Sequence, residues 1–206
     1  MIDLSSKIYR VLFPSVTFSG AGNAVHLTFD DGPHPTATSI VLNILKQFNL
    51  KSTFFLLGRQ VEQFPELARL IAADGHTIGN HSFSHGNLVF RREGFVRREV
   101  TTTNELIFQT CGVKPKLFRP PFGFFDLRTL NIVESLEMRL VHWSNDSRDF
   151  ESRTTEENIV NLIRRIDKGS IVLLHDNDST AGKIGTILPT MIRGLLNRGL
   201  NFSSLD

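Results

Sequence analysis

Apolar residues form two kinds of pattern along the chain. Short continuous runs predict buried strands, and stripes of helical period predict amphipathic helices. The first run, residues 24–29 (AVHLTF), stops before a glycine and a proline, which end a central strand. Strands are predicted over residues 24–29, 52–57, 76–79, 116–119, 139–144, 170–175 and 200–204. Helices are predicted over residues 36–48, 60–73, 94–110, 127–137, 155–167 and 183–198, the last interrupted by Pro189.

Strand and helix thus alternate about seven times, which is typical of a mostly parallel sheet. Seven short strands favour closure towards a barrel, although alternation alone does not exclude an open, doubly wound sheet. We therefore predict an α/β fold of a single domain, a distorted (β/α)7 barrel similar to a TIM barrel. Residues 1–20 would form an N-terminal extension and residues 21–206 the barrel.

Composition excludes several classes of protein. The formal net charge of +2 and the 21% of charged residues do not indicate nucleic acid or an anionic membrane as partner. Two arginine pairs at 91–92 and 97–98 are interpreted as a solvated helix face rather than a binding patch. Cys111 is the only cysteine, so an intrachain disulfide or a thiolate zinc site is excluded. No window is long and apolar enough to span a membrane.

Polar residues gather after the predicted strands. In a parallel sheet or barrel, the carboxyl ends of the strands meet on one face, where function usually lies. Residues far apart in the sequence would converge there. The residues concerned are Asp30, Asp31, His81, His85, Arg119, Asp146, Asp149 and His175.

The pattern of acids and histidines suits a metal. Asp30 and Asp31 repel each other, and both stay ionised only if a cation or strong donors compensate; on their own they could equally form a turn with a helix cap. His81 and His85, four residues apart, would share a face on a helical turn. Such a pair alone is more typical of surface or capping histidines. Together with an acid at a strand end, it favours a His-His-Asp site with open positions, as in catalytic metal centres.

Three further residues each allow two interpretations. The guanidinium of Arg119 could hold a carboxylate oriented and ionised, or form an ordinary surface ion pair. His175 follows four apolar residues at a strand end and is a candidate general acid or base, although many such histidines are only hydrogen-bonded in a core. Trp143 would more often be a core residue.

Five stretches in this order closely resemble the polysaccharide deacetylase family, the NodB-homology domain of carbohydrate esterase family four. They are residues 28–33 (TFDDGP), 81–85 (HSFSH), 118–123 (FRPPFG), 142–150 (HWSNDSRDF) and 171–176 (IVLLHD). The resemblance covers residues 25–175 directly. It implies a distorted barrel of seven parallel strands, which agrees with the count of predicted strands.

The resemblance also implies roles for individual residues. Asp31, His81 and His85 would bind the metal, Asp30 would be the catalytic base, and Arg119 would orient that base. His175 would be the general acid and Asp149 the acid that pairs with it. Phe122 would contribute its backbone N–H to the oxyanion site. The substrate pocket would be lined by Trp143, Phe150 and Leu174.

The sequence departs from the family pattern at three positions. Phe122 stands where the family usually has tyrosine, Phe150 where it has tryptophan, and Val172 where it has leucine. None of these changes removes a group that does chemistry. The two aromatic changes therefore affect the expected substrate rather than the expected reaction.

The resemblance implies a metal-dependent hydrolase that removes N-acetyl groups from glycans containing N-acetylglucosamine, such as chitooligosaccharide or peptidoglycan. The cofactor would be one divalent ion, with zinc as first choice and cobalt or iron also suited to the ligands. Partners would be N-acetylated glycans, with no nucleic acid and no transmembrane segment. Residues 1–20 lack the layout of a signal peptide, which by default suggests the cytoplasm, although the family often acts outside the membrane.

Four alternatives stay open at this point. The same machinery serves acetylxylan esterases, and a deformylase of a lipid-linked aminosugar would be marked by an apolar, basic-rimmed surface beside the site. A non-haem iron oxygenase also uses two histidines and a carboxylate but has no use for Asp30 or His175. A non-catalytic glycan-binding protein would usually have lost the base or the acid.

Overall fold

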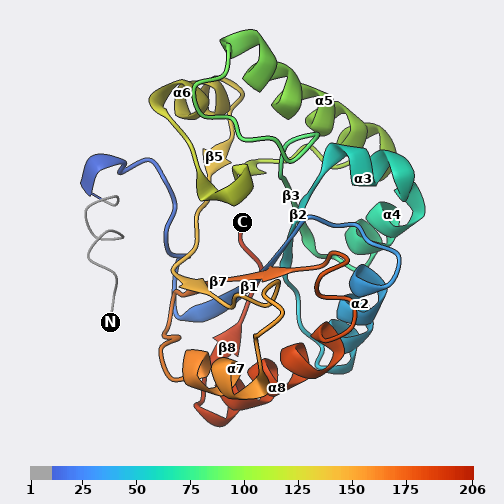
Figure 1. The fold of residues 1–206 in the computed structure, drawn as a ribbon, viewed down its shortest axis with the longest axis vertical. Helices are drawn as coiled ribbons and strands as arrows, with labels where there is room; N and C mark the ends of the chain where they lie inside the picture. The colour runs from blue at the N-terminus through green and yellow to red at the C-terminus, as the bar shows by residue number, and fades with distance from the viewer. Residues whose placement is uncertain (1–10) are drawn as a thin grey trace.

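The computed structural model describes residues 11–206 and shows a parallel sheet flanked by helices (Figure 1). The strand order is β5-β4-β3-β2-β1-β7-β6, and β8 pairs with β1 away from this path. Every strand pair recorded among the described residues is parallel. The strands are β1 (Ala24–Asp30), β2 (Thr53–Leu56), β3 (Thr77–Asn80), β4 (Leu117–Phe118), β5 (Arg139–Leu140), β6 (Asn145–Asp146), β7 (Ile171–His175) and β8 (Asn201–Phe202).

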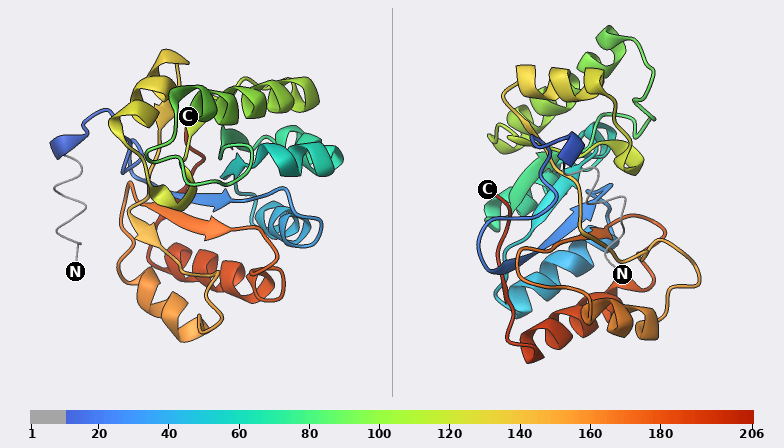
Figure 2. Two further views of the ribbon diagram at one scale, coloured as in Figure 1. Left: turned by 45° about the horizontal axis from the view of Figure 1, so that its top comes forward. Right: turned by 90° about the vertical axis from the view of Figure 1, so that its left-hand side faces the viewer.

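The helices occupy the segments between the strands. They are α2 (Ala37–Gln47), α3 (Gly58–Gln63), α4 (Pro65–Ala73), α5 (Glu93–Cys111), the 3-10 turn η1 (Pro121–Gly123), α6 (Leu127–Ser135), α7 (Glu156–Ile163) and α8 (Ile184–Asn197). Figures 1 and 2 show them on the outside of a curled half-barrel. The predicted single-domain α/β barrel of seven parallel strands is thereby confirmed, as a barrel that stays open between β5 and β6.

The two faces of β1 explain where the site lies. Val25, Leu27 and Phe29 point into the main apolar core, which includes side chains of α2, α7 and α8. Alternation sends Thr28 and Asp30 to the opposite, inner face, where both are buried. Burying polar groups requires partners. The inner face of the sheet is therefore committed to a polar network at the carboxyl end of β1.

Two predicted elements are not continuous in the structure. The predicted helix 60–73 is two helices, because Pro65 lacks a donor and disfavours helical backbone at Phe64, whose φ is −129°. The predicted strand 139–144 is a strand only at its start, β5, and the chain pairs again just after its end, in β6, at the opposite end of the sheet path. Residues 141–144 cross the opening of the half-barrel between them.

The C-terminal helix and the N-terminal segment also differ from expectation. Helix α8 runs through Pro189 without interruption, because the buried side chains of Leu188 and Met191 anchor it on both sides of the proline. Val16 and Phe18, in the predicted extension, are buried against the barrel, and Thr17 pairs with Val141. The remainder of that extension, residues 1–10, lies outside the described residues. Among the described helices, none combines the length and the apolar character needed to cross a membrane.

Candidate active site

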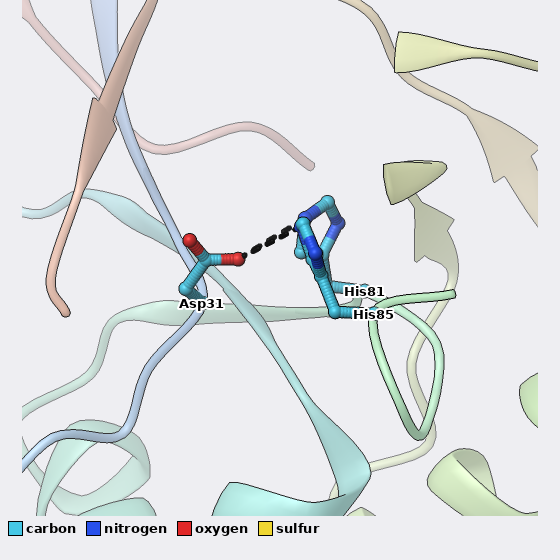
Figure 3. A group of neighbouring side chains, drawn as sticks. All are labelled: Asp31, His81 and His85. Carbon is cyan, nitrogen blue, oxygen red and sulfur yellow. Dashed lines mark ion pairs between the residues drawn. The ribbon is translucent and has the colours of Figure 1, made fainter. Parts of the chain in front are cut away.

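Asp31, His81 and His85 converge at the carboxyl ends of β1 and β3 (Figure 3). One ligand atom from each lies within 4.8 Å of the others. Oδ1 of Asp31 is 3.2 Å from Nε2 of His85 and 3.6 Å from Nε2 of His81. Nδ1 of His81 lies 2.7 Å from the carbonyl oxygen of Arg119 and donates to it, which leaves the lone pair of Nε2 facing Asp31.

This group fits a divalent metal ion on its own chemistry. Oδ1 of Asp31 is buried and receives no hydrogen bond from the described residues, a costly state unless a cation takes that position. Burial alone would raise the pKa of Asp31, but the neighbouring histidines and the amide of Asn177, 2.8 Å from Oδ2, lower it. Burial, followed by the charge of His81, lowers the pKa of His85 and keeps it neutral, as a ligand must be.

The segment that carries the two histidines is not the helical turn predicted for it. Ser82 and His85 have positive φ, 67° and 61°, and residues 81–88 contain no helix. The local reason is Glu99 of α5, whose carboxylate accepts the N–H of Phe83 (3.1 Å) and of Ser84 (2.9 Å). In a helix these two N–H groups would donate to backbone carbonyls of the preceding turn. Here they donate to Glu99 instead, so the loop bends back and both imidazoles face Asp31.

Glu99 is a functional residue that the sequence reasoning missed. An acid in a long helix resembles a solvated surface residue, yet Glu99 is only 8% exposed. The available signal was its place among Val96, Val100 and Thr103, which form a buried stripe on α5.

Arg119 holds Asp30 beside the group of Asp31, His81 and His85. The guanidinium is fully buried, and its Nη1 lies 2.8 Å from Oδ1 of Asp30 and 2.7 Å from Oγ1 of Thr28. Nη2 donates to the carbonyl of His142, and the ring of Phe55 lies 4.1 Å from the guanidinium carbon. Oδ2 of Asp30 is left facing His81, 3.8 Å from Nε2. The carboxylate is thus fixed with one oxygen directed into the site.

His175 and Asp149 form a second acid–base group. Nδ1 of His175 donates to Oδ1 of Asp149 at 2.7 Å, and the N–H of His175 donates to Oδ2 at 2.8 Å. Burial opposes protonation of His175, but the hydrogen bond and charge of Asp149, with Asp30 and Asp31 nearby, raise its pKa to about 9. The imidazolium is therefore the resident form at neutral pH in the metal-free protein.

Comparison with known proteins agrees with this geometry. The sequence model described as polysaccharide deacetylase matches residues 19–141, more than half of the 206 residues. The chain belongs to the polysaccharide deacetylase family. A chitooligosaccharide deacetylase of Azorhizobium caulinodans is 37% identical over 155 residues, 75% of this chain and 74% of the relative. A peptidoglycan-N-acetylglucosamine deacetylase of Bacillus cereus is 36% identical over 192 residues, 91% of this chain and 70% of the relative.

Solved structures share the fold of this polysaccharide deacetylase. The crystal structure of a peptidoglycan N-acetylglucosamine deacetylase in complex with 4-naphthalen-1-yl-N-oxidanyl-benzamide has a TM-score of 0.89 and 34% sequence identity. The match covers 96% of this chain and 94% of that one. The family is metal-dependent, and the Asp31, His81 and His85 group supplies a site for the metal.

Aromatic side chains line the site of this deacetylase. The ring of Phe122 is 4.6 Å from that of His85, and the ring of Phe150 is 5.2 Å from that of His175, both edge-on. Phe122 has a positive φ of 59°. Trp143 stacks on His142 at 4.0 Å and lies 5.8 Å from the guanidinium of Arg119. The predicted aromatic residues therefore all lie near His85, His175 or Arg119.

Of the other highlighted positions, Leu174 faces away from the site, whereas Asp146 lies near His175 and Asp149. Leu174 is fully buried in the main core with Phe29, its register partner on β1, and so faces away from the site. The prediction for Leu174 fails because side chains alternate along β7, so that Leu173 shares the face of His175. Asp146 accepts the N–H of Arg148 at 2.8 Å and shapes the turn before Asp149.

A cleft opens next to the metal group. It has a volume of about 280 Å³, and Asp31 and His85 form part of its wall. The other wall residues are polar or charged apart from Leu57: His34, Arg59, Gln60, Asn177, Asp178 and Ser179. A polar, open cleft of this kind suits a hydroxyl-rich ligand better than an apolar small molecule.

Proposed function

We propose that this deacetylase hydrolyses N-acetyl groups on glycans that contain N-acetylglucosamine, either chitooligosaccharide or peptidoglycan. One observation carries the proposal. The buried, unpartnered Oδ1 of Asp31 faces two imidazoles, and both Asp30, which Arg119 holds, and the protonated His175 lie near it. The names of the relatives supply the substrate class.

Asp31, His81 and His85 would hold the metal. When bound there, a divalent ion lowers the pKa of water and stabilises negative charge on the amide oxygen. Two imidazoles and one carboxylate, with positions left open, suit zinc, which is our first choice.

Asp30 acts as the general base. Its Oδ1 is occupied by Arg119, so Oδ2 is the oxygen available to accept the proton from the attacking water. Because one oxygen is held, the other points in a fixed direction. This lowers the entropy lost when the transition state forms. Arg119 is a positioning residue, since it is buried behind Asp30.

His175 acts as the general acid. Its pKa of about 9 keeps the ring protonated at neutral pH, and Nδ1 is engaged by Asp149, so Nε2 is the atom that donates to the departing amine. A carboxylate base and an imidazolium acid in different environments give the two protonation states that amide hydrolysis needs. The backbone N–H of Phe122 contributes to binding the oxyanion.

Two alternatives are weighed against this proposal. An iron oxygenase would leave Asp30, Arg119 and the His175–Asp149 pair without a role. A deformylase of a lipid-linked aminosugar uses the same reaction class, and one observation favours a membrane-bound substrate, namely an apolar surface with arginines at the rim of the site.

The experiment is release of acetate from metal-stripped protein, with and without added zinc or cobalt. The substrates are chitotetraose and peptidoglycan glycan strands. Asp30→Asn should abolish acetate release, while Glu105→Gln, at an exposed acid of α5 outside the cleft, should retain it. Acetate release that is independent of metal, or equal in Asp30→Asn, would overturn the proposal.

A further inference from the structure

Three large apolar side chains are exposed on one side of the molecule. Phe90 is 91% exposed, Leu127 65% and Phe124 58%. Single exposed apolar residues are ordinary in soluble proteins and need no explanation. A group of them in one place is unusual, so their relative positions decide whether they matter.

The three residues belong to one surface built from two segments. The N–H of Phe90 donates to Oδ2 of Asp126 at 3.2 Å, which places the loop before α5 against the residue that precedes Leu127. Nη1 of Arg128 donates to the carbonyl of Arg91 and ties the same two segments again. We call Phe90, Phe124 and Leu127 the apolar ridge.

The apolar ridge adjoins the active site. The rings of Phe124 and Phe122 lie 6.3 Å apart, and Phe122 in turn contacts His85. In the right-hand view of Figure 2, the loop before α5, the turn η1 and the loop before α7 lie along the same side of the molecule. A large partner that covers the ridge would therefore meet the rim of the site as well.

The ridge is bordered by positive charge. Arg91, Arg92 and Arg128 are exposed, and in the part of the chain that the structure describes none lies within ion-pair distance of an acid. Glu93, the nearest acid along the chain to Arg91 and Arg92, pairs with Arg97 at 3.0 Å, and Asp126 beside Arg128 offsets one of the three positive charges. The net charge of +2 for the whole chain conceals this local excess.

We propose that this side of the protein docks onto an anionic phospholipid bilayer, with the apolar ridge among the lipid headgroups and Arg91, Arg92 and Arg128 against the phosphates. Exposed Phe and Leu beside arginines are the composition of membrane-surface segments. Phenylalanine rings also stack on the apolar faces of sugar rings, so insoluble peptidoglycan and chitin are the competing ligands in the test, whereas Leu127 and the three arginines match a bilayer surface better. Phe90, although 91% exposed, is also absent from the lining of the polar cleft that would hold a sugar.

Docking in this way would turn the site towards the bilayer surface. The substrate would then be a glycan attached to, or lying against, the membrane, such as a lipid-linked aminosugar. This consequence rests on the proposed function, whereas docking itself does not. The two can fail separately, since one is measured as vesicle binding and the other as acetate release from a soluble oligomer.

The test is sedimentation of the full chain with phospholipid vesicles of two compositions, phosphatidylcholine alone and phosphatidylcholine with phosphatidylglycerol. We expect binding to the anionic vesicles that weakens with added salt. Phe90→Ser with Leu127→Ser should lower the partition coefficient about a hundredfold, since each buried side chain contributes about tenfold or more. Arg91→Gln with Arg92→Gln should abolish the preference for anionic lipid.

The matched control is Phe108→Ser. Phe108 is another exposed phenylalanine, 47% exposed, and lies in the C-terminal half of α5. It should bind vesicles like the unchanged protein. All variants should release acetate from soluble chitotetraose at the same rate as the unchanged protein, which excludes misfolding. Equal vesicle binding by the ridge and control variants, or no binding by the unchanged protein, would overturn the proposal. Binding to insoluble peptidoglycan or chitin through the same residues, without vesicle binding, would overturn it in favour of a glycan surface.

Discussion

Ser84 donates its N–H to Oε2 of Glu99 at 2.9 Å, and its hydroxyl lies within hydrogen-bond distance of both oxygens of the same carboxylate, 3.0 Å from Oε2 and 3.1 Å from Oε1. The contact links helix α5 to the loop that carries His81 and His85. It fixes the positive-φ backbone that directs both imidazoles at Asp31. Residues outside the immediate ligand group commonly set metal affinity in this way.

Replacing Glu99 should therefore weaken metal binding. Glu99→Gln keeps the shape but turns one acceptor into a donor that faces the N–H groups of Phe83 and Ser84. We expect zinc affinity to fall about 10- to 100-fold, with the same far-UV circular dichroism. Calorimetric titration of metal-stripped protein measures this, and Glu105→Gln, at an exposed position of the same helix, is the control. Unchanged zinc affinity in Glu99→Gln would show that the loop keeps its shape without the carboxylate.

Removing Arg119 should destabilise the fold as well as the activity. In Arg119→Met, Asp30 would remain buried without its cation, which typically costs about 3–5 kcal/mol. Arg119→Lys should fall between, because an ammonium cannot bond Asp30, Thr28 and the carbonyl of His142 together. Denaturant unfolding measures the loss. The double variant Asp30→Asn with Arg119→Met should be less destabilised than the sum of the single variants, and strict additivity would contradict direct coupling.

The proton on His175 should depend on Asp149. In metal-free protein, a nuclear magnetic resonance titration should give His175 a pKa of about 9. A raised pKa contributes stability that is complete below the unfolded value of about 6.5 and is lost as pH rises through about 9. Asp149→Asn should lower the pKa of His175 and shift the basic limb of the rate profile to lower pH. If His175 has the same pKa in the unchanged protein and in Asp149→Asn, then Asp149 is not what raises it, and the prediction is wrong.

His76 should make stability fall in acid. Burial, followed by the charge of Lys51, lowers its pKa to about 4, and its Nδ1 accepts the N–H of Ser52 at 3.2 Å. Because the unfolded chain binds the proton at about pH 6.5, stability decreases as pH falls from about 6.5 to about 4. His76→Asn should flatten that slope in urea unfolding. His142, whose pKa is also about 4, should account for the pH dependence of stability that remains. If His76→Asn keeps the full pH dependence, His76 is not its source.

The sequence predicted the acids and histidines at strand ends because that rule depends only on topology. Asp30, Asp31 and His175 follow directly from apolar runs, and parallel strands bring their ends together. The helical turn at His81 was wrong because Glu99, distant in the sequence, redirects the backbone. Leu174 was wrong by one position, since an all-apolar strand does not reveal which side chains face inward.

The apolar ridge could not be read from the sequence either. Phe90 and Leu127 lie in separate segments, and the hydrogen bonds from Phe90 to Asp126 and from Arg128 to Arg91 show that they share a surface. The arginine pair at 91–92 looked like part of a helix face, whereas both residues precede the first residue of α5. Whether a side chain is exposed depends on the assembled fold. The pattern of apolar residues in the sequence therefore could not distinguish the phenylalanines of the ridge from those of the core.

The most direct test of the account measures zinc binding and acetate release on the same samples of metal-stripped protein. We predict one equivalent of zinc bound by the unchanged protein, and acetate release that rises in proportion to zinc occupancy. Asp31→Asn should lose both, while Asp30→Asn should bind zinc and release no acetate. Acetate release by Asp31→Asn at the unchanged rate, or full zinc binding in a variant that lacks Asp31, His81 and His85, would contradict the assignment of the site.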